Sequence, residues 1–313
     1  MEEFGDIMSF SLDTKLAIIG KEENKSCCIL AEIAAYIFAS GTVVMHGGGK
    51  YSIKISFDMP ALARRTFSLI RNQYGIRPKL SVIRHNRFGG GYKYILTLPS
   101  GSFLALATQL KLVDYEGRLK SLIPQYVPHK TCCKRAFIKA SFLCIGSVQN
   151  PQKGYHLEMV SKSEYYIKLL RRLCNGFGIE TRHTKRRDSE VLYIKKADTI
   201  SDFLALVDAD SSVMKLENTL VRKQVINSIN RAMNCDNSNI NKTIGAASRQ
   251  INDIRIAIAS EQMNAELLEL ANLRLANPDL SLEQIGSLCD PPLSKSGVVY
   301  RFKKIHNIAE KYR

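Results

Sequence analysis

The fold is decided by two stretches, CCILAEIAAYIFASGTV at residues 27–43 and CCKRAFIKASFLCIGSV at residues 132–148. A shift of 105 residues superposes their cysteine pairs, several alanines, and the glycines Gly41 and Gly146. Each stretch is rich in small and apolar residues and ends at a glycine, as helices commonly do. The repeat therefore predicts one structural unit that is built twice along the chain.

The segments after each glycine extend the repeat. Each unit has an alternating segment that predicts a half-buried strand, then an amphipathic helix closing on Gly-Ile, two further strands and a last helix. The predicted strands are 50–57, 79–84, 92–98, 154–160, 181–186 and 191–196, and the predicted helices after the opening ones are 60–76, 100–113, 163–179 and 199–209. We expect two halves, about 1–113 and 126–209, within a domain that spans residues 1–209.

Small residues recur on one face of each opening helix. The rows are Ala31, Ala35 and Ala39 in the first helix and Ala136, Ala140 and Cys144 in the second. Such a row allows two helix backbones to approach closely. We therefore expect the two helices to form the seam of a pseudo-two-fold domain, with two ordinary buried helices as the alternative.

Four of the eight cysteines form the adjacent pairs Cys27-Cys28 and Cys132-Cys133. A chain of 313 residues does not depend on disulfides to fold, and a reducing compartment keeps thiols free. Adjacent cysteines on a helix point in different directions, which makes each pair a poor set of joint ligands. We interpret the pairs as small buried side chains and expect no metal ion and no cofactor.

Positive charge dominates the composition. The formal net charge is +16, of which residues 1–210 carry +12. Such an excess favours a polyanionic partner, most often nucleic acid. A basic surface kept only for solubility is the alternative.

The composition is that of a soluble globular protein, with 45% hydrophobic and 24% charged residues. No run approaches the roughly 18 apolar residues that cross a bilayer. The opening residues MEEFGDIMSF are acidic, whereas a secretory signal begins with basic residues. We expect a cytoplasmic protein with no membrane partner.

The pattern changes after residue 209. Residues 210–262 predict a helical linker with two helices, 213–234 and 243–259, separated by CDNSNINK at residues 235–242. The Asn, Asp and Ser residues of that segment favour a turn or a helix N-cap. Residues 263–313 predict three short helices, in which Ser281 and Gln284 have capping-box spacing.

The last two helices, joined by a turn at Asp290-Pro291-Pro292-Leu293, predict a helix-turn-helix whose second helix is basic. In that helix apolar residues recur at helical spacing and predict a core face. The opposite face and the helix start carry hydroxyl and basic groups that suit base edges and phosphates. The candidate DNA-binding residues are Ser294, Lys295, Ser296, Tyr300, Arg301, Lys303 and Lys304. A three-helix module for protein contacts is the alternative.

Two predicted hairpins of the repeated domain are also basic. Such residues on an open sheet neutralise phosphates, while a solvated charged hairpin is the alternative for each of them. The candidate DNA-binding residues are Arg84, Arg87, Arg182, Lys185, Arg186 and Arg187, accompanied by Arg77, Lys79, His85, Lys93 and His183. The triple glycines at 47–49 and 89–91 precede no helix with a Lys-Ser or Lys-Thr pair, which argues against a nucleotide-binding loop.

The duplicated small-residue helices, with their strand and helix pattern, resemble the LAGLIDADG fold of homing endonucleases. The resemblance implies an α+β fold: a duplicated αββαββα saddle with pseudo-two-fold symmetry, here followed by an all-α helix-turn-helix domain. In the endonucleases an acidic residue before each final glycine holds divalent metal. The corresponding positions are Ser40 and Ile145, which cannot replace a carboxylate. We therefore expect no catalytic residue and no DNA cleavage.

The segments at residues 132–160 and 270–312, which include CCKRAF and SKSGV, closely resemble the WhiA family of bacterial regulators. The resemblance covers essentially the whole chain. It implies a sequence-specific DNA-binding transcriptional regulator in cell division and chromosome segregation, and in sporulation in spore formers. It also implies double-stranded DNA as partner, a nucleoid-associated location in the cytoplasm, and other transcription or division proteins as candidate partners.

Two other readings of the sequence stay open. One is a metal-dependent DNA endonuclease whose carboxylates come from outside the opening helices. The other is a non-catalytic adaptor that keeps the saddle for protein contacts.

Overall fold

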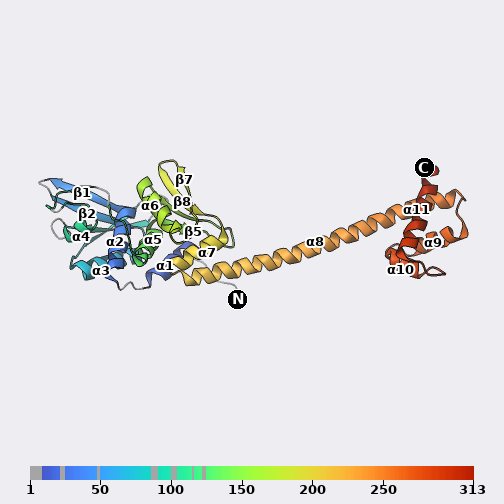
Figure 1. Cartoon of the computed structure of the whole chain (residues 1–313), viewed down its shortest axis with the longest axis horizontal. Coiled ribbons are helices and arrows are strands. Elements are labelled where there is room, and N and C mark those ends of the chain that lie inside the picture. The colour runs from blue at the N-terminus through green and yellow to red at the C-terminus, as the bar shows by residue number, and fades with distance from the viewer. Residues whose placement is uncertain are drawn as a thin grey trace. The chain divides into compact units, whose positions relative to one another are not determined.

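The computed structural model describes residues 9–21, 25–47, 50–85, 91–99, 104–114, 116–121 and 125–313. It divides into two compact units, Met1–Arg222 and Lys223–Arg313 (Figure 1). Arg87 and the triple glycine at 89–91 fall wholly or partly outside the described residues, as does part of 47–49. No helix in the described part of the chain is long and apolar enough to span a membrane.

Helices α2 (Ser26–Ser40) and α5 (Thr131–Ile145) form the seam of the first unit. Of the small residues in the predicted rows, Ala31, Ala35 and Ala140 are fully buried. Tyr166, from a helix of the second half, donates a hydrogen bond of 3.3 Å to the carbonyl of Ala35 in the first. The predicted close packing of the two opening helices is confirmed.

Each seam helix ends at a glycine that the packing requires. A Cβ on Gly41 would overlap the carbonyl oxygen of Ile37, one turn earlier, and a Cβ on Gly146 would overlap the ring of Phe142. Both glycines have extended backbone, with φ of −78° and −86°. The chain therefore leaves the helix and enters a strand at once, which only a residue without a side chain permits at this spacing.

Both halves build the same four-stranded antiparallel sheet (Figure 1). The first contains β1 (Gly41–Gly47), β2 (Lys50–Phe57), β3 (Lys79–His85) and β4 (Gly91–Leu98) in the order β1-β2-β4-β3. The second contains β5 (Gly146–Val148), β6 (Leu157–Ser161), β7 (Arg182–Arg186) and β8 (Ser189–Ile194) in the order β5-β6-β8-β7. The shared order confirms the duplication.

The helices that accompany each sheet follow the predicted pattern. Helix α3 (Pro60–Tyr74) in the first half corresponds to α6 (Glu164–Asn175) in the second, and α4 (Leu104–Gln109) corresponds to α7 (Ala197–Leu206). Pro60 starts α3 where its missing N–H costs nothing. Gly75 ends it in the left-handed conformation at φ 67°, as the Gly-Ile pattern predicts.

The residue patterns missed the first strand of each sheet. Both β1 and β5 begin at the glycine that ends a seam helix, with no turn residues between helix and strand. Strand β5 is three residues long, which is too short to show an alternating pattern. Only the family resemblance implied the fourth strand.

Helix α1 (Phe10–Ile19) was also missed, and it breaks the symmetry of the two halves. Ser9 caps it by accepting from Leu12 N. Its Ser11 Oγ accepts from the backbone N–H of Val148 at 3.2 Å, which satisfies a donor on edge strand β5. Thr14 Oγ1 lies 2.8 Å from Ser212 Oγ in a buried hydrogen bond.

The expected break in the linker is wrong. Residues 210–259 form one continuous helix, α8 (Asp210–Ala259), which runs through CDNSNINK without a turn. That segment contains no proline, and Asn, Asp and Ser lower helix propensity by only a few tenths of a kcal/mol each. Such a cost is smaller than the loss of the backbone hydrogen bonds at two new helix ends.

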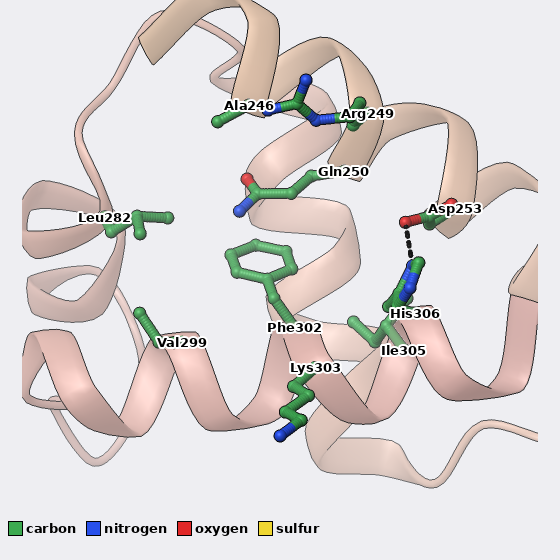
Figure 2. A pocket seen from close by; sticks show the side chains of 10 residues that line it. All are labelled: Ala246, Arg249, Gln250, Asp253, Leu282, Val299, Phe302, Lys303, Ile305 and His306. Carbon is green, nitrogen blue, oxygen red and sulfur yellow. Dashed lines mark hydrogen bonds and ion pairs between the residues drawn. The ribbon is translucent and has the colours of Figure 1, made fainter. Parts of the chain in front are cut away.

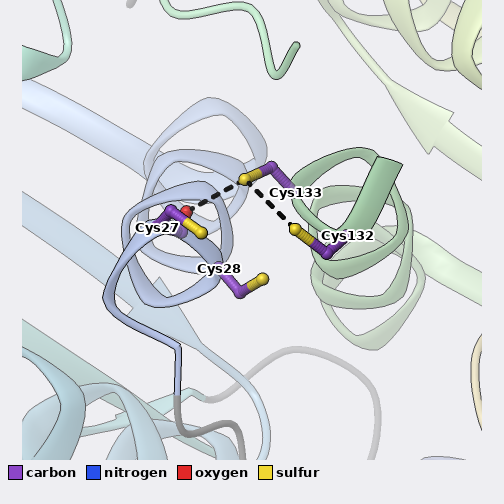
Figure 3. Close-up of side chains that lie close together, drawn as sticks. All are labelled: Cys27, Cys28, Cys132 and Cys133. Atoms are coloured by element: carbon purple, nitrogen blue, oxygen red, sulfur yellow. Dashed lines mark hydrogen bonds between the residues drawn. The ribbon is translucent and has the colours of Figure 1, made fainter. Parts of the chain in front are cut away.

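The sequence did not show that the two cysteine pairs meet in the folded chain. Each pair occupies the first turn of a seam helix, and the seam brings the two first turns together (Figure 3). All four sulfur atoms lie within 4.8 Å of one another. Two residues of one helix do diverge, but here each diverges toward a thiol of the other helix.

Candidate nucleic-acid interface

The second unit ends in three capped helices, α9 (Ala265–Ala276), α10 (Leu282–Ser287) and α11 (Lys295–Lys311). The predicted capping box is present, because Ser281 Oγ accepts from Gln284 N while Gln284 Oε1 accepts from Ser281 N at 2.9 Å. Ser294 caps α11 by accepting from Gly297 N at 3.3 Å. These caps fix where α11 begins.

The turn between α10 and α11 is tight. Gly286 accepts a hydrogen bond of 2.8 Å from Leu293 N, and a Cβ at Gly286 would overlap the Leu293 carbonyl oxygen. The core beneath the turn contains the predicted apolar face of α11, which is Val298, Phe302, Ile305 and Ala309. The helix-turn-helix geometry thus rests on one glycine contact and one apolar stripe.

The outward face of α11 carries most of the predicted residues. Ser294, Lys295, Ser296, Tyr300, Lys303 and Lys304 are all exposed. Tyr300 is 61% exposed, and Lys304 Nζ lies 4.7 Å from the centre of its ring. The structure therefore leaves three hydroxyl groups, one of them on an aromatic ring, and three ammonium groups exposed between the N-cap and the middle of the helix.

Arg301 departs from this arrangement. Its side chain is only 19% exposed, and its guanidinium lies 3.2 Å from the carboxylate of Glu266 on α9. The guanidinium is thus directed to the neighbouring helix rather than outward from the face of α11. Periodicity placed Arg301 on the flank of the helix but could not identify an acid on another helix.

A cavity of about 340 Å³ lies beside α11 (Figure 2). Its lining comes from α8, α10 and α11, and includes Gln250, Phe302 and Lys303. At one end Asp253, which is buried, accepts from His306 Nδ1 at 2.8 Å and from the Arg313 guanidinium at 2.9 Å. These contacts hold the last turns of α8 against the C-terminal end of the chain, including α11.

Helix α8 adds basic residues that sequence reasoning assigned to a linker. Arg249 lines the cavity that Lys303 lines, and Lys242 lines a second one together with Lys295. All four side chains are exposed. No local pattern marks Lys242 and Arg249, because their position depends on the packing of α8 against α10 and α11.

A buried arginine, Arg274, ties these helices together. Its Nε donates to Gln250 Oε1 on α8 at 3.0 Å, and its Nη1 donates to the Leu280 carbonyl at 2.5 Å. Burial lowers the pKa of the Arg274 guanidinium, opposed by the nearby Asp279. Its side chain is enclosed by the fold, so its role is structural.

In the second sheet of the first unit, strand register sorts the predicted basic residues. Arg182 pairs with Tyr193 and Arg186 with Ser189, which places both arginines on the face opposite the buried Leu192 and Ile194. Lys185 pairs with Glu190, so it lies on the same face as Leu192, which is the face that packs on the core. Arg187 is in the β7–β8 turn at φ 52°.

The open face of this sheet is only partly basic. Arg186 donates to Glu158 at 3.0 Å, and Glu158 also lies 3.2 Å from His156. The side chain of Arg186 remains 61% exposed. Arg182 and Arg186 are thus available to solvent on this face. Lys185 is also exposed but lies on the other face, because neighbouring residues of a strand alternate.

The first sheet shows the same sorting. Arg84 pairs with Tyr92, on the side of the sheet where Leu96 and Leu98 enter the core. Lys79 and Lys93 lie on the opposite, open side. Thr97 of β4 pairs with Lys79 of β3 and also with Lys54 of β2, so Lys54 lies on the open side as well. Lys54 was missed, although the alternation in KYSIKISF places it opposite the buried isoleucines. Arg84 is exposed but does not share the face of Lys79.

The seam end that would hold metal in a nuclease lacks carboxylates at both expected positions. Ser40 Oγ donates to the Tyr36 carbonyl at 3.2 Å, and Ile145 packs against the core. The acid that remains in α2, Glu32, is buried and bound by Arg65 and by the Tyr36 hydroxyl. Among the described residues, the four seam cysteines form the one group of three or more His, Cys, Asp or Glu side chains placed to share an ion.

A cation lies near that end of the seam. Burial lowers the pKa of Lys15 on α1, and the opposing influences come from Cys144 and Asp58. Burial also raises the pKa of the Cys144 thiol well above its usual range. An ammonium group beside a neutral thiol is a poor setting for a hard divalent cation.

Comparison with known proteins gives matches along the whole chain. The model of the WhiA N-terminal LAGLIDADG-like domain matches residues 26–113, the model of the WhiA LAGLIDADG-like domain matches residues 134–226, and the model of the WhiA C-terminal HTH domain matches residues 229–309.

Curated relatives match at full length. "Probable cell division protein WhiA" of Alkaliphilus metalliredigens is 36% identical over 313 residues, which is 98% of this chain and 99% of the relative. The protein of the same name from Clostridium beijerinckii is 36% identical over 318 residues, with 98% and 99% covered. The crystal structure of full-length DUF199/WhiA from Thermatoga maritima covers 98% of this chain and 99% of its own, at a TM-score of 0.59 and 23% identity.

These matches agree with the architecture built from the residues. Two degenerate LAGLIDADG-like halves and a terminal helix-turn-helix occur here in the order of the three domain models. Identity of 36% along the full length of a relative extends the agreement to the whole sequence. The chain belongs to the WhiA family.

Proposed function

We propose that this protein is a sequence-specific regulator that binds double-stranded DNA and does not cleave it. The observation that carries the proposal is the outward face of α11, where Ser296, Tyr300 and Lys303 are exposed immediately after a tight turn. Hydroxyl and ammonium groups at the start of a recognition helix suit base edges and phosphates in the major groove. The net charge of +16 supports a polyanionic partner.

In this proposal the two domains make different contacts with DNA. Residues 263–313 read sequence through α11, with Lys242 and Arg249 of α8 adding phosphate contacts beside it. Residues 1–209 contribute phosphate contacts through the open sheet faces, at Lys54, Lys79, Lys93, Arg182 and Arg186, and residues 210–262 join the two. Two DNA contacts on one chain raise the overall affinity wherever both are made at once.

The absence of cleavage is supported by the seam. Ser40 and Ile145 supply no anionic oxygen ligand, and Glu32 is neutralised by Arg65. A role in cell division is supported by the printed names of the relatives. Chromosome segregation, sporulation control and a nucleoid-associated position in the cytoplasm follow from the family resemblance alone and belong to the same proposal.

The decisive experiment is selection of DNA by the purified full-length protein. Sheared genomic DNA is bound and washed, and the retained fragments are sequenced. We expect a shared motif, with an affinity for a duplex carrying it that falls steeply as salt rises. Retention of fragments with no common motif would overturn sequence-specific reading, and no salt-dependent binding at all would favour the adaptor.

Cleavage is tested separately. The same preparation is incubated with supercoiled plasmid and Mg²⁺ at low salt, and we expect the plasmid to stay intact. Nicking that co-purifies with the protein and disappears when an exposed seam-end acid, Asp58, is changed to Asn would overturn the binding-only proposal.

A second candidate function has one observation in its favour. On the core-facing side of the β3–β4 hairpin, Leu80, Val82 and Tyr92 are each about half exposed. Apolar side chains gathered on one strand pair are typical of a protein-binding patch. An adaptor that uses this patch could also bind DNA through α11, whereas an adaptor that acts in place of a DNA-binding protein would retain no DNA in a salt-dependent way in the selection experiment.

A further inference from the structure

The seam holds a cluster of four cysteines that DNA binding does not use. Cys27 and Cys28 come from the first turn of α2, and Cys132 and Cys133 from the first turn of α5 (Figure 3). Their four sulfur atoms lie within 4.8 Å of one another, and Cys132 Sγ is 4.0 Å from Cys133 Sγ. The thiols therefore converge from two segments that are 105 residues apart in the sequence.

These separations suit a single tetrahedral ion. With Zn–S bonds of about 2.3 Å, the sulfurs of a tetrathiolate site are about 3.8 Å apart. The observed cluster exceeds this by about 1 Å at most, so rotation of the cysteine side chains is enough to close it around an ion. A cluster of several iron atoms would need its sulfur ligands farther apart than a single ion does.

We propose that Cys27, Cys28, Cys132 and Cys133 bind one Zn²⁺ ion, which joins the two halves of the duplicated domain at the start of the seam. Four thiolates select a soft, tetrahedral cation. The protein supplies all four ligands, which makes the site structural, with no open position for chemistry. Each pair contributes two ligands, so the ion cross-links the halves.

The surroundings favour thiolate ligands. The four cysteines occupy the first turns of two helices, and helix N-termini stabilise negative charge. Lys25 and Lys130 stand at the N-cap positions of α2 and α5, and Lys134 follows Cys133. A tetrathiolate zinc centre carries a net charge of about −2, which two helix N-termini stabilise.

Packing alone does not require sulfur at these positions. Elsewhere in α2 and α5, Ala31, Ala35 and Ala140 are fully buried without sulfur. Cys27 and Cys132 are only half-buried. If packing required only a small side chain at these positions, alanine would serve at all four. Cysteine-to-alanine variants therefore test whether the sulfur atoms have a role beyond packing.

The test is metal uptake by the full-length protein, reduced and stripped with a chelator. Co²⁺ is titrated first, because a tetrathiolate Co²⁺ site has intense d–d and charge-transfer absorption, and Zn²⁺ is then added to displace it. We expect one equivalent of Co²⁺ per chain and its complete displacement by Zn²⁺. No tetrathiolate absorption in the reduced protein would overturn the proposal, as would a Cys-Cys disulfide across the seam that persists in reducing buffer.

Matched variants separate the site from the fold. Cys132→Ala removes one ligand with the loss of only a half-buried sulfur atom, while Cys235→Ala, at an exposed position on α8, removes a thiol that is not in the cluster. We expect Cys132→Ala to lose the tetrathiolate spectrum and Cys235→Ala to keep it. Zinc should raise the unfolding midpoint of the wild type and of Cys235→Ala but not that of Cys132→Ala. Equal responses in all three would overturn the proposal.

Discussion

Glu32, the acid retained in the first seam helix, lies 2.5 Å from Arg65 Nε on α3 and is fully committed to the fold. Its second oxygen accepts from Arg65 Nη2 at 3.0 Å, and the Tyr36 hydroxyl donates to it at 2.6 Å. The same guanidinium donates to the carbonyls of Ile19 and Lys21, so the network joins α1, α2 and α3. A carboxylate held in this way is a structural anchor rather than a metal ligand.

Removal of Glu32 should therefore destabilise the protein strongly. Glu32→Ala leaves Arg65 buried without its counter-charge, and breaking a buried pair in this way costs about 3–5 kcal/mol. Urea denaturation measures the loss. Glu164→Ala, which removes an exposed partner of Lys168, is the control and should unfold close to the wild type. A small loss for Glu32→Ala would mean that water reaches Arg65.

The outward face of α11 makes a second prediction. Lys303→Ala should weaken binding to the selected duplex and reduce its salt dependence by about one phosphate contact. Fluorescence anisotropy across a salt series measures both. Lys311→Ala, an equally exposed lysine in the last turn of the same helix, is the matched control. Equal losses in the two variants would point to general charge rather than a recognition face.

Strand register makes a third prediction. Arg182→Ala and Arg186→Ala remove charge from the open face of the second sheet, whereas Lys185→Ala removes it from the other face. If the open face contacts DNA, the two arginine variants should weaken binding to any sequence, and the Lys185 variant should not. Binding to a scrambled duplex is the measurement. A larger loss of binding for the Lys185 variant would show that DNA contacts the opposite face of this sheet.

The sequence was sufficient for the repeat and for the caps, because both are local patterns. Residues close together in the sequence are enough to predict the glycines that end α2 and α5, the Ser281 capping box and the apolar stripe of α11. The sequence did not predict strands β1 and β5, because each begins directly at the end of a helix with no turn residues to mark the boundary. The predicted break in α8 failed because weak helix formers lower propensity without ending a helix.

The site was less predictable than the fold, because it depends on which elements meet. Charge alone marked Arg84 and Lys185 as candidates. Only the strand pairing shows that each lies on the face of its sheet opposite the other basic residues, Lys79 and Lys93 in the first sheet and Arg182 and Arg186 in the second. Periodicity placed Arg301 on the flank of α11 but did not show that its guanidinium pairs with Glu266 on α9. The cysteine pairs were judged one helix at a time, and the cluster exists only because two helices start side by side.

The glycines at the ends of the seam helices make a fourth prediction. Gly146→Ala places a methyl group against the Phe142 ring, and overpacking of this kind costs about 1–3 kcal/mol. Thermal unfolding measures the loss. Gly245→Ala, in the open surface of α8, has no atom within 4 Å of the new Cβ and should stabilise the helix by up to about 1 kcal/mol. Opposite signs for the two variants are the expected result.

The metal-free cysteine cluster makes a fifth prediction, about alkylation and pH. Only the thiolate reacts, so a lowered pKa brings reaction at lower pH and a raised pKa delays it. Hydrogen bonds, the largest from Cys28, lower the pKa of Cys132, whereas burial raises that of Cys133 to about 12. As pH rises through neutrality, iodoacetamide should therefore label Cys132 well before Cys133 in the native, chelated protein.

Peptide mass spectrometry after brief labelling at each pH resolves the two positions. The exposed Cys235 serves as the internal measure of reagent activity. Added Zn²⁺ should protect Cys132 and leave Cys235 reactive, because a bound thiolate is no longer free to attack. Labelling of Cys133 as early as Cys132 would contradict the assigned order, since it would require the more buried thiol to ionise as readily as its neighbour.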